Sequence, residues 1–399
     1  MSGGRGLRIG IDATCLASRR GYGRFLRELL PPLGERARAA GHELLLFLDR
    51  STEVDLDGID LPAVRPATSR SQAEAASARS SRGLGDLLAM GRAVARERLD
   101  VMYFPSVYSF FPVPGRTPVA VGFHDTIAER YGHVVFPSLR TRWLWRAKVR
   151  WARRRAQGIV TVSEWSRDSL ADYFKIPRGR IFVTVEAPGS AFQPARDAGA
   201  RRAWLRRRDL DPDARYLIYV GGFNPHKNLA LALDAFASAL ARTPDLHWLW
   251  VGDAQGDPFH GEVDRLSERI AERGLGERVH WVGFVPDPEL VELYSGALAC
   301  LLPSLEEGFG LPAVEAAACG APCVATLRSP LPALLEGGGL FVDPGSREAL
   351  SAAIVRLATE PGLRDRLGAV ALERARALSW EATAGATLEA LWKVAEAGR

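Results

Sequence analysis

Short apolar segments alternate with amphipathic segments along nearly the whole chain, and this alternation limits the fold more than any other feature. In the first half, strands are expected at residues 7–11, 43–48, 101–104, 118–123, 158–162 and 181–185. In the second half, they are expected at residues 216–220, 246–251, 279–282, 298–302, 322–325 and 340–342. Helical patterns separate many of them, at residues 163–174, 228–241, 261–273, 287–295 and 347–359. Strands that alternate with helices form βαβ units, so we predict an α/β protein with two Rossmann-like halves joined near residues 187–200.

Composition and length narrow the class of protein. A chain of 399 residues with 47% hydrophobic and 25% charged residues is a typical globular composition at more than one domain length. No apolar run approaches the roughly 18–20 residues that cross a bilayer, and no secretory leader pattern opens the chain. Its 4 cysteines are scattered and make no metal-ligand spacing. We therefore expect a cytoplasmic protein with reduced thiols.

Two segments interrupt the alternation. Residues 66–82 are rich in Ser, Ala and Arg, and no secondary structure is predicted there. From Arg130 to Ser163 there is no acidic residue, while basic residues crowd one predicted helix from Arg140 to Arg155.

The basic helix has two interpretations. Leu139, Trp143, Ala147 and Trp151 are four residues apart and form an apolar stripe. The helix could lie on an anionic membrane surface as a peripheral contact, or it could pack on its own domain with a solvated basic face. Nucleic-acid binding is not expected, because no recognised motif accompanies the charge.

The sharpest motif lies in the second half, where a Gly-containing loop joins the strand ending near Leu302 to a helix that opens with Pro312. Such a loop presents free backbone N–H groups and the positive end of a helix dipole, which together favour a phosphate. Glu307 precedes the helix and Glu315 is expected in its first turn. Carboxylates can accept hydrogen bonds from the vicinal hydroxyls of a sugar.

The run Glu307-Gly308-Phe309-Gly310-Leu311-Pro312, followed by Glu315-Ala316 and Cys319-Gly320, resembles the donor-binding signature of retaining glycosyltransferases of family 4. The resemblance spans several motifs over most of the chain. It implies the two-domain GT-B fold, in which two Rossmann-like domains face each other across a cleft. It also implies that Glu307 holds the transferred sugar, that Glu315 holds the ribose, and that the amides from Gly308 to Leu311 hold the diphosphate.

A second match is the strand-to-helix junction from Tyr219 to Asn228, which carries Lys227 at the helix entrance. A lysine there could neutralise a departing nucleoside diphosphate. The family often has an arginine where this chain has Gly222, so the second cation of the clamp is missing; His226 or Arg328 could replace it. Similar enzymes hold the nucleobase near the position of Val285.

The first half supplies candidates for the acceptor side. Gly21, Tyr22 and Gly23 open a helix after the first strand, where the family has a glycine-rich turn near the donor phosphate and the acceptor. His124 and Asp125 follow the strand at residues 118–123 and resemble the family's His-Asp element beside the transferred sugar. Similar enzymes also place the turn of Ser163 near the substrate, although a helix cap explains this serine equally well.

The resemblance implies transfer of a hexose from a nucleoside-diphosphate sugar, GDP-mannose or a UDP-hexose, to a saccharide, lipid-linked or small-molecule acceptor in cell-envelope or polysaccharide biosynthesis. The expected catalytic residues are Glu307, Lys227 and His124, with no metal or other cofactor. The expected domains are residues 1–190 for the acceptor, 191–378 for the donor and 379–399 as a helix that packs back toward the first domain. Two alternatives stay open: a sugar-nucleotide epimerase on the same fold, and a catalytically silent nucleotide-sugar-binding scaffold. A nicotinamide dehydrogenase is disfavoured, because Leu26 stands where the third glycine of its fingerprint would be.

Overall fold

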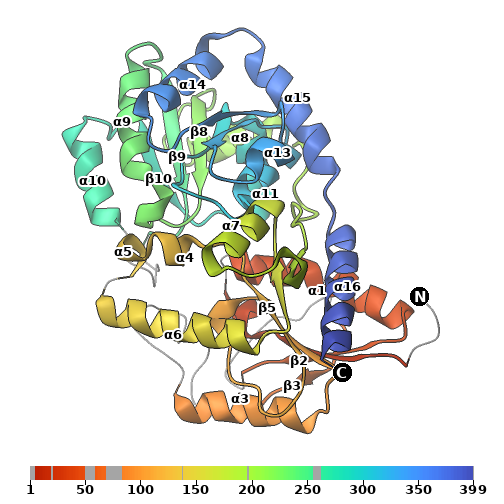
Figure 1. The fold of residues 1–399 in the computed structure, drawn as a ribbon. Coiled ribbons are helices and arrows are strands. Elements are labelled where there is room, and N and C mark those ends of the chain that lie inside the picture. The colour runs from red at the N-terminus through yellow and green to blue at the C-terminus, as the bar shows by residue number, and fades with distance from the viewer. Residues whose placement is uncertain are drawn as a thin grey trace. The chain divides into compact units, whose positions relative to one another are not determined.

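A computed structural model of the protein describes residues 5–18, 21–49, 59–68, 83–136, 138–195, 197–254 and 262–398. Its contacts divide the chain into two compact units. Unit 1 comprises Met1–Gly132, Phe136–Glu186 and Ser379–Arg399, and unit 2 comprises His133–Val135 and Ala187–Leu378. The two are described separately below (Figure 1).

Unit 1 is built on a seven-stranded parallel sheet with the order β3-β2-β1-β4-β5-β6-β7. The strands are β1 (Arg8–Asp12), β2 (Glu43–Phe47), β3 (Ala63–Val64), β4 (Val101–Phe104), β5 (Val119–Gly122), β6 (Gly158–Thr161) and β7 (Ile181–Val183). The helices along this part of the chain are α1 (Gly21–Ala39), α3 (Leu84–Arg96), α4 (Ile127–Arg130), α5 (Gly132–Val135), α6 (Leu139–Arg155) and α7 (Glu164–Phe174). The short 3₁₀ helices are η1 (Thr14–Ala17), η2 (Val107–Ser109) and η3 (Arg178–Arg180).

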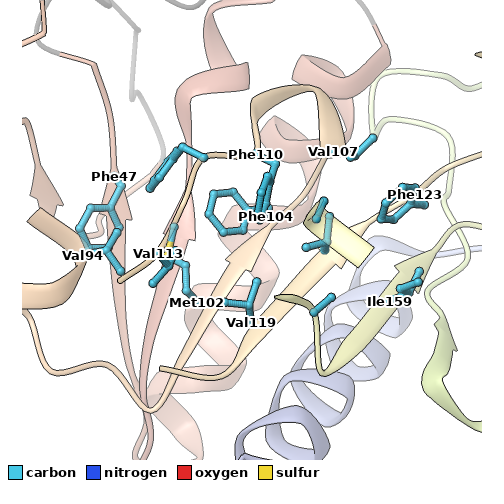
Figure 2. Packing of buried hydrophobic residues seen from close by; sticks show 14 of the residues in the cluster. Phe47, Val94, Met102, Phe104, Val107, Phe110, Val113, Val119, Phe123 and Ile159 are labelled. Atoms are coloured by element: carbon cyan, nitrogen blue, oxygen red, sulfur yellow. The ribbon is translucent and has the colours of Figure 1, made fainter. Parts of the chain in front are cut away.

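One face of this sheet packs against α3, α6 and α7. Alternate strand residues such as Met102 and Phe104 enter a continuous apolar cluster that also contains Val94 from α3 and Val149 from α6. Figure 2 shows Phe104 beside Phe110, whose ring centroids are 5.0 Å apart. The strands therefore read as nearly unbroken apolar runs, because helices cover a parallel sheet of this kind on both faces.

The C-terminal helix α16 (Trp380–Ala397) belongs to unit 1, although Ala187–Leu378 of unit 2 separates it in sequence from the other elements of unit 1. It packs along α1 and contacts β4, β5, β6 and β7. Its first turn is anchored by Trp380, whose ring centroid is 5.8 Å from that of Phe25. The hydroxyl of Thr383 donates a hydrogen bond to the carbonyl oxygen of Val185.

Unit 2 is built on a six-stranded parallel sheet with the order β10-β9-β8-β11-β12-β13. The strands are β8 (Arg215–Val220), β9 (Leu246–Val251), β10 (Val279–Gly283), β11 (Ala299–Leu302), β12 (Cys323–Thr326) and β13 (Gly339–Val342). The helices are α8 (Ala198–Arg206), η4 (Pro225–Lys227), α9 (Leu229–Leu240), α10 (Val263–Glu272), α11 (Asp287–Gly296), α12 (Leu311–Ala318), α13 (Leu331–Leu334), α14 (Arg347–Thr359) and α15 (Leu363–Arg376).

The α/β class and the two Rossmann-like sheets expected from the alternation are confirmed. All four cysteines are buried and unbridged. Of the segment at residues 66–82, only 66–68 are described, and they carry no helix or strand; the rest lies outside the described residues. No helix in the described part of the chain is long and apolar enough to cross a membrane.

Candidate functional site

The strand order of unit 2 reverses between β8 and β11, which are neighbours in the sheet although the chain visits β9 and β10 between them. Ligands of open α/β sheets bind at the carboxyl ends of the strands on either side of such a reversal. The loop after β8 carries Lys227, and the loop after β11 carries Glu307. The backbone N–H of Leu305 donates a hydrogen bond of 2.8 Å to the carbonyl of His226, which ties the two loops together.

An aromatic cluster holds the Lys227 loop in place. Phe223 is fully buried, and its ring lies 5.8 Å from that of Trp250 and 4.7 Å from that of Trp281. The hydroxyl of Tyr219 donates to the carbonyl of Gly222. Gly222, which stands where the family often has an arginine, is thus held by a hydrogen bond from Tyr219, a buried residue of β8.

Lys227 and Glu307 form an ion pair, with 2.7 Å between Nζ and Oε1. The hydroxyl of Ser304 donates to the same carboxylate oxygen. Only 19% of the lysine side chain and 10% of the glutamate side chain are exposed, so the pair is weakly screened by solvent. The structure therefore brings the two residues expected to grip the leaving group and the sugar to one point.

The entrance of α12 leaves backbone donors for a ligand. Gly310 caps the helix in a left-handed conformation with φ 91°. A Cβ there would lie 2.8 Å from Cδ1 of Leu331, so both the dihedral angle and the space require glycine. The N–H groups of Phe309, Gly310 and Leu311 donate to no other described residue. Three free donors at a helix N-terminus form an anion-binding concavity.

The remaining donor-side candidates are more buried. The helix begins at Leu311, so Glu315 lies in the second turn of α12, whereas the sequence predicted the first turn. The reason is that the helix begins one residue before Pro312, the first helical residue expected from sequence. Only 1% of Glu315 is exposed. Val285 is buried in the loop between β10 and α11.

His226 cannot replace the missing arginine. Burial, together with the neighbouring charge of Lys227, lowers the pKa of this imidazole to about 3, so it is neutral at physiological pH. The backbone N–H of Glu307 donates a hydrogen bond of 3.0 Å to the carbonyl oxygen of Arg328. Arg328 itself is exposed. Arg328 is thus the remaining one of the two cations considered for this role.

In unit 1 the sheet order reverses between β1 and β4, and His124 follows β5, the next strand. Nε2 of His124 lies 3.0 Å from the carbonyl oxygen of Pro105, which follows β4. Nδ1 lies 3.4 Å from Oε1 of Glu186, which follows β7 and is 6% exposed. With an oxygen opposite each nitrogen, the imidazole is held in one orientation.

Several acceptor-side candidates gather around this histidine. Tyr22, His124 and Asp125 line one small cavity of about 10 Å³, the size of a single water molecule. The ring centroids of Tyr22 and His124 are 4.8 Å apart. An oxygen of Asp125 accepts a hydrogen bond of 2.8 Å from the N–H of Ile127. These three residues are therefore brought together, as expected from sequence.

Local structure accounts for some of the remaining acceptor-side candidates, which are Gly21, Gly23 and Ser163. A Cβ on Gly23 would lie 1.8 Å from the carbonyl oxygen of Ser18, so this glycine is required by the preceding loop. Apart from its chain neighbours and the backbone of its own helix, no atom of the described residues lies within 4 Å of the position that a Cβ on Gly21 would take. Ser163 caps α7 by accepting a hydrogen bond of 3.0 Å from the N–H of Ser166.

Sequence reasoning missed Glu186, although its signal was available. Glu186 follows the expected strand at residues 181–185 as directly as His124 follows the strand at residues 118–123. Since carboxyl ends of parallel strands share one edge of a sheet, a carboxylate there should have been considered beside the histidine.

The basic helix packs through a face other than its predicted stripe. Val149 and Ala152 are buried in the core of unit 1. The stripe instead faces solvent: Leu139 is 82% exposed, Trp143 is 69% exposed and Trp151 is 52% exposed. The helix is thus held to its own domain and still presents apolar side chains among basic ones.

Two family models match the chain over most of its length. A model described as "Glycosyl transferases group 1" matches residues 200–374, and a model described as "Glycosyltransferase Family 4" matches residues 32–184. The first match contains the Lys227 and Glu307 loops, and the second contains the His124 loop.

Known proteins agree with these matches. O-antigen chain mannosyltransferase B of Escherichia coli is 32% identical over 59% of this chain and 60% of its own length. A D-inositol 3-phosphate glycosyltransferase of Kribbella flavida is 35% identical over 52% of this chain. The chain spans 50% of that protein, so these matches cover between half and 60% of the relatives' own lengths. The solved structure of HepE from Anabaena with UDP and glucose superposes with a TM-score of 0.71 at 19% identity, over 97% of this chain and 100% of that chain, which shows the two-domain GT-B fold.

Proposed function

Because the chain belongs to the group 1 and family 4 glycosyltransferases, we propose that it transfers a hexose from a nucleoside-diphosphate sugar to an acceptor hydroxyl with retention of anomeric configuration. The observation that carries this proposal is the Lys227–Glu307 ion pair of 2.7 Å beside the free N–H groups of the α12 entrance. A cation and a helix N-terminus meet there at the point where a diphosphate would gain negative charge as it leaves.

On the donor side, the ammonium of Lys227 and the amides from Gly308 to Leu311 bind the diphosphate. Glu307 then accepts hydrogen bonds from the hydroxyls of the transferred sugar, and Glu315 accepts them from the ribose. Val285 and Gly222 lie at strand ends, where backbone groups contact the nucleotide. Arg328 supplies the second positive charge, since His226 is neutral. No metal ion is needed for this charge balance.

On the acceptor side, the imidazole of His124 binds the transferred sugar, and Glu186 positions that imidazole. Tyr22 and Asp125 form the adjoining wall, while Gly21 leaves space for the substrate. The acceptor hydroxyl attacks the anomeric carbon, its proton passes to the departing phosphate oxygen, and the bond between carbon and that oxygen breaks. Charge stabilisation by Lys227 and the helix terminus is expected to be the largest contribution to the rate.

The relatives support two donor classes and an envelope or polysaccharide acceptor. The mannosyltransferase name supports GDP-mannose and a saccharide chain, whereas HepE, solved with UDP and glucose, supports a UDP-hexose. A peripheral site on the inner face of a membrane, contacted through the exposed stripe and arginines of α6, would give access to a lipid-linked acceptor.

The test is a transfer assay with GDP-mannose and UDP-glucose as donors. Lys227→Ala and Glu307→Gln should each lower the rate by about 100-fold or more. The first removes the cation that faces the departing phosphate, and the second removes the carboxylate that holds both the sugar hydroxyls and the ammonium of Lys227. Matched controls exist in α16, where Lys393 and Glu389 form an exposed pair of 2.6 Å. Lys393→Ala and Glu389→Gln should leave the rate unchanged.

Near-normal transfer by both site variants, with the wild-type circular dichroism spectrum, would overturn the assignment. The anomeric configuration of the product, read by nuclear magnetic resonance, tests retention. Incubation with the donor alone tests the epimerase alternative, which predicts an isomerised sugar. The silent scaffold predicts nucleotide binding without turnover by the wild type.

A further inference from the structure

A second cavity lies within unit 1 between α4, α6 and α7. It has a volume of about 340 Å³, at the lower end of the range for small-molecule sites. Its wall is mostly arginine and aromatic: the lining residues are Glu129, Arg146, Val149, Arg150, Arg153, Arg154, Tyr173 and Phe174. We call it the arginine pocket.

The arginines of this pocket form a row of unneutralised charge. Arg146, Arg150 and Arg154 are four residues apart on α6, with Arg153 beside them. Within the described ranges, none of these arginines joins an ion pair. Like charges at this spacing destabilise a helix, so the row favours a ligand that neutralises it.

Among the residues that the structure describes, the one carboxyl group that lines the pocket, Glu129, offsets at most one of the four positive charges. Burial, followed by the nearby charge of Asp125, raises the pKa of Glu129 to about 7. Its Oε1 also accepts a hydrogen bond of 2.9 Å from the indole N–H of Trp145. Burial, together with the charges of Arg150 and Arg154, lowers the pKa of Arg153, the direction expected for a cation among cations.

The aromatic wall orients the positive groups. Cζ of Arg153 lies 4.3 Å from the ring centroid of Phe174, a cation–π distance that restrains the guanidinium. A fixed planar fork binds phosphate oxygens in pairs, which a flexible ammonium cannot do. Phe174 and Val149 also give the pocket an apolar side that suits the carbon skeleton of an ester.

We propose that the arginine pocket binds the phosphoryl group of an anionic ligand, a phosphate or pyrophosphate ester, through its guanidinium groups. This site is additional to the diphosphate site at Lys227 and does not depend on the transfer reaction. The phosphoryl group belongs to a lipid headgroup at a membrane or to a soluble phosphorylated molecule, and the experiment separates these sources.

The test uses the full chain and two probes in 0.15 M salt, where diffuse attraction is screened beyond about 8 Å. Inorganic pyrophosphate is titrated by calorimetry, and phosphatidylcholine vesicles containing phosphatidic acid are sedimented with the protein. The pocket variant is Arg150→Gln with Arg154→Gln, two exposed positions whose replacement spares the core. The matched control is Arg92→Gln with Arg96→Gln, two exposed arginines four residues apart on α3, which removes the same charge from another helix of unit 1.

The pocket variant should lose about tenfold or more in affinity, and the control less than about twofold. Arg150→Lys with Arg154→Lys should fall between them, because it keeps the charge and loses the fork. Loss of pyrophosphate binding in the pocket variant identifies a soluble phosphoryl ligand, and loss confined to the vesicles identifies a lipid headgroup. Equal losses in the pocket variant and the control, or no binding of either probe, would overturn the proposal. Lys227→Ala removes the donor-side anion site alone, so failure of one proposal is distinguishable from failure of the other.

Discussion

Glu129 is the residue in unit 1 whose titration should be visible in stability. Its pKa rises from 4.5 to about 7 in the folded protein, with burial as the main cause. The folded state therefore holds a proton that the unfolded state releases between these values, so the free energy of unfolding falls as pH rises from about 4.5 to 7. A shift of this size corresponds to about 3–4 kcal/mol at most.

Glu129→Gln should abolish this loss, since the amide mimics the protonated acid and can still accept the hydrogen bond of Trp145. The thermal midpoint of the variant should match that of the wild type at pH 5 and exceed it at pH 8, measured by circular dichroism. Glu389→Gln, an exposed control, should match the wild type at both values. An unchanged difference between the two pH values would show that Glu129 is ionised in the fold throughout.

At the residue level, the sequence predicted positions near strand ends but not side-chain partners. Lys227 and Glu307 could be predicted separately from their loops. Their ion pair could not, because it depends on β8 and β11 being neighbours in the sheet. The arginine pocket likewise needs Phe174 of α7 beside α6, which no local pattern encodes. A site whose side chains come from two elements can be predicted only once the topology that brings those elements together is known.

The exposed stripe of α6 gives a prediction at the level of the element. Leu139→Ser with Trp143→Ser should weaken binding to anionic vesicles by about tenfold or more, because both side chains are free to enter the interface and neither supports the core. Stability should stay within about 0.5 kcal/mol of the wild type. Cosedimentation and thermal unfolding measure the two quantities.

Leu88→Ser is the control for that experiment, since Leu88 is 53% exposed on α3. It should leave vesicle binding unchanged. If the stripe variant also binds vesicles as the wild type does, the contribution of α6 is electrostatic at most, and the membrane role of the stripe is refuted.

The alternation predicted several strands and helices, some of them with their observed bounds. β4 and β9 have the expected bounds, as does α14. It did not predict β3, which has only two residues and no periodicity to detect. It also did not identify α15, which follows α14 directly after Pro361 and Gly362 with no strand between them. The alternation of strands and helices does not predict α15, because α15 packs on α12 and does not link two strands.

For the whole molecule, nucleotide binding should appear as a gain in stability. At a concentration about 100 times its dissociation constant, a ligand that binds only the folded state adds about 2.7 kcal/mol. GDP, UDP and ADP are compared by thermal shift, and GDP or UDP should raise the midpoint. Lys227→Ala should reduce that shift, and Lys393→Ala should preserve it. If none of the three moves the wild-type midpoint, the diphosphate site at α12 is not a nucleotide site.

The return of α16 to unit 1 sets an order for folding during synthesis. Domains generally fold as they leave the ribosome, the N-terminal one first. Here the sheet that begins at β1 lacks the helix lying along α1 until residues 379–399 have been translated. Unit 2 has all of its segments by Leu378. The part of the protein that is made first is therefore completed last, and the nascent chain must protect an uncovered apolar sheet while nearly two hundred further residues are added.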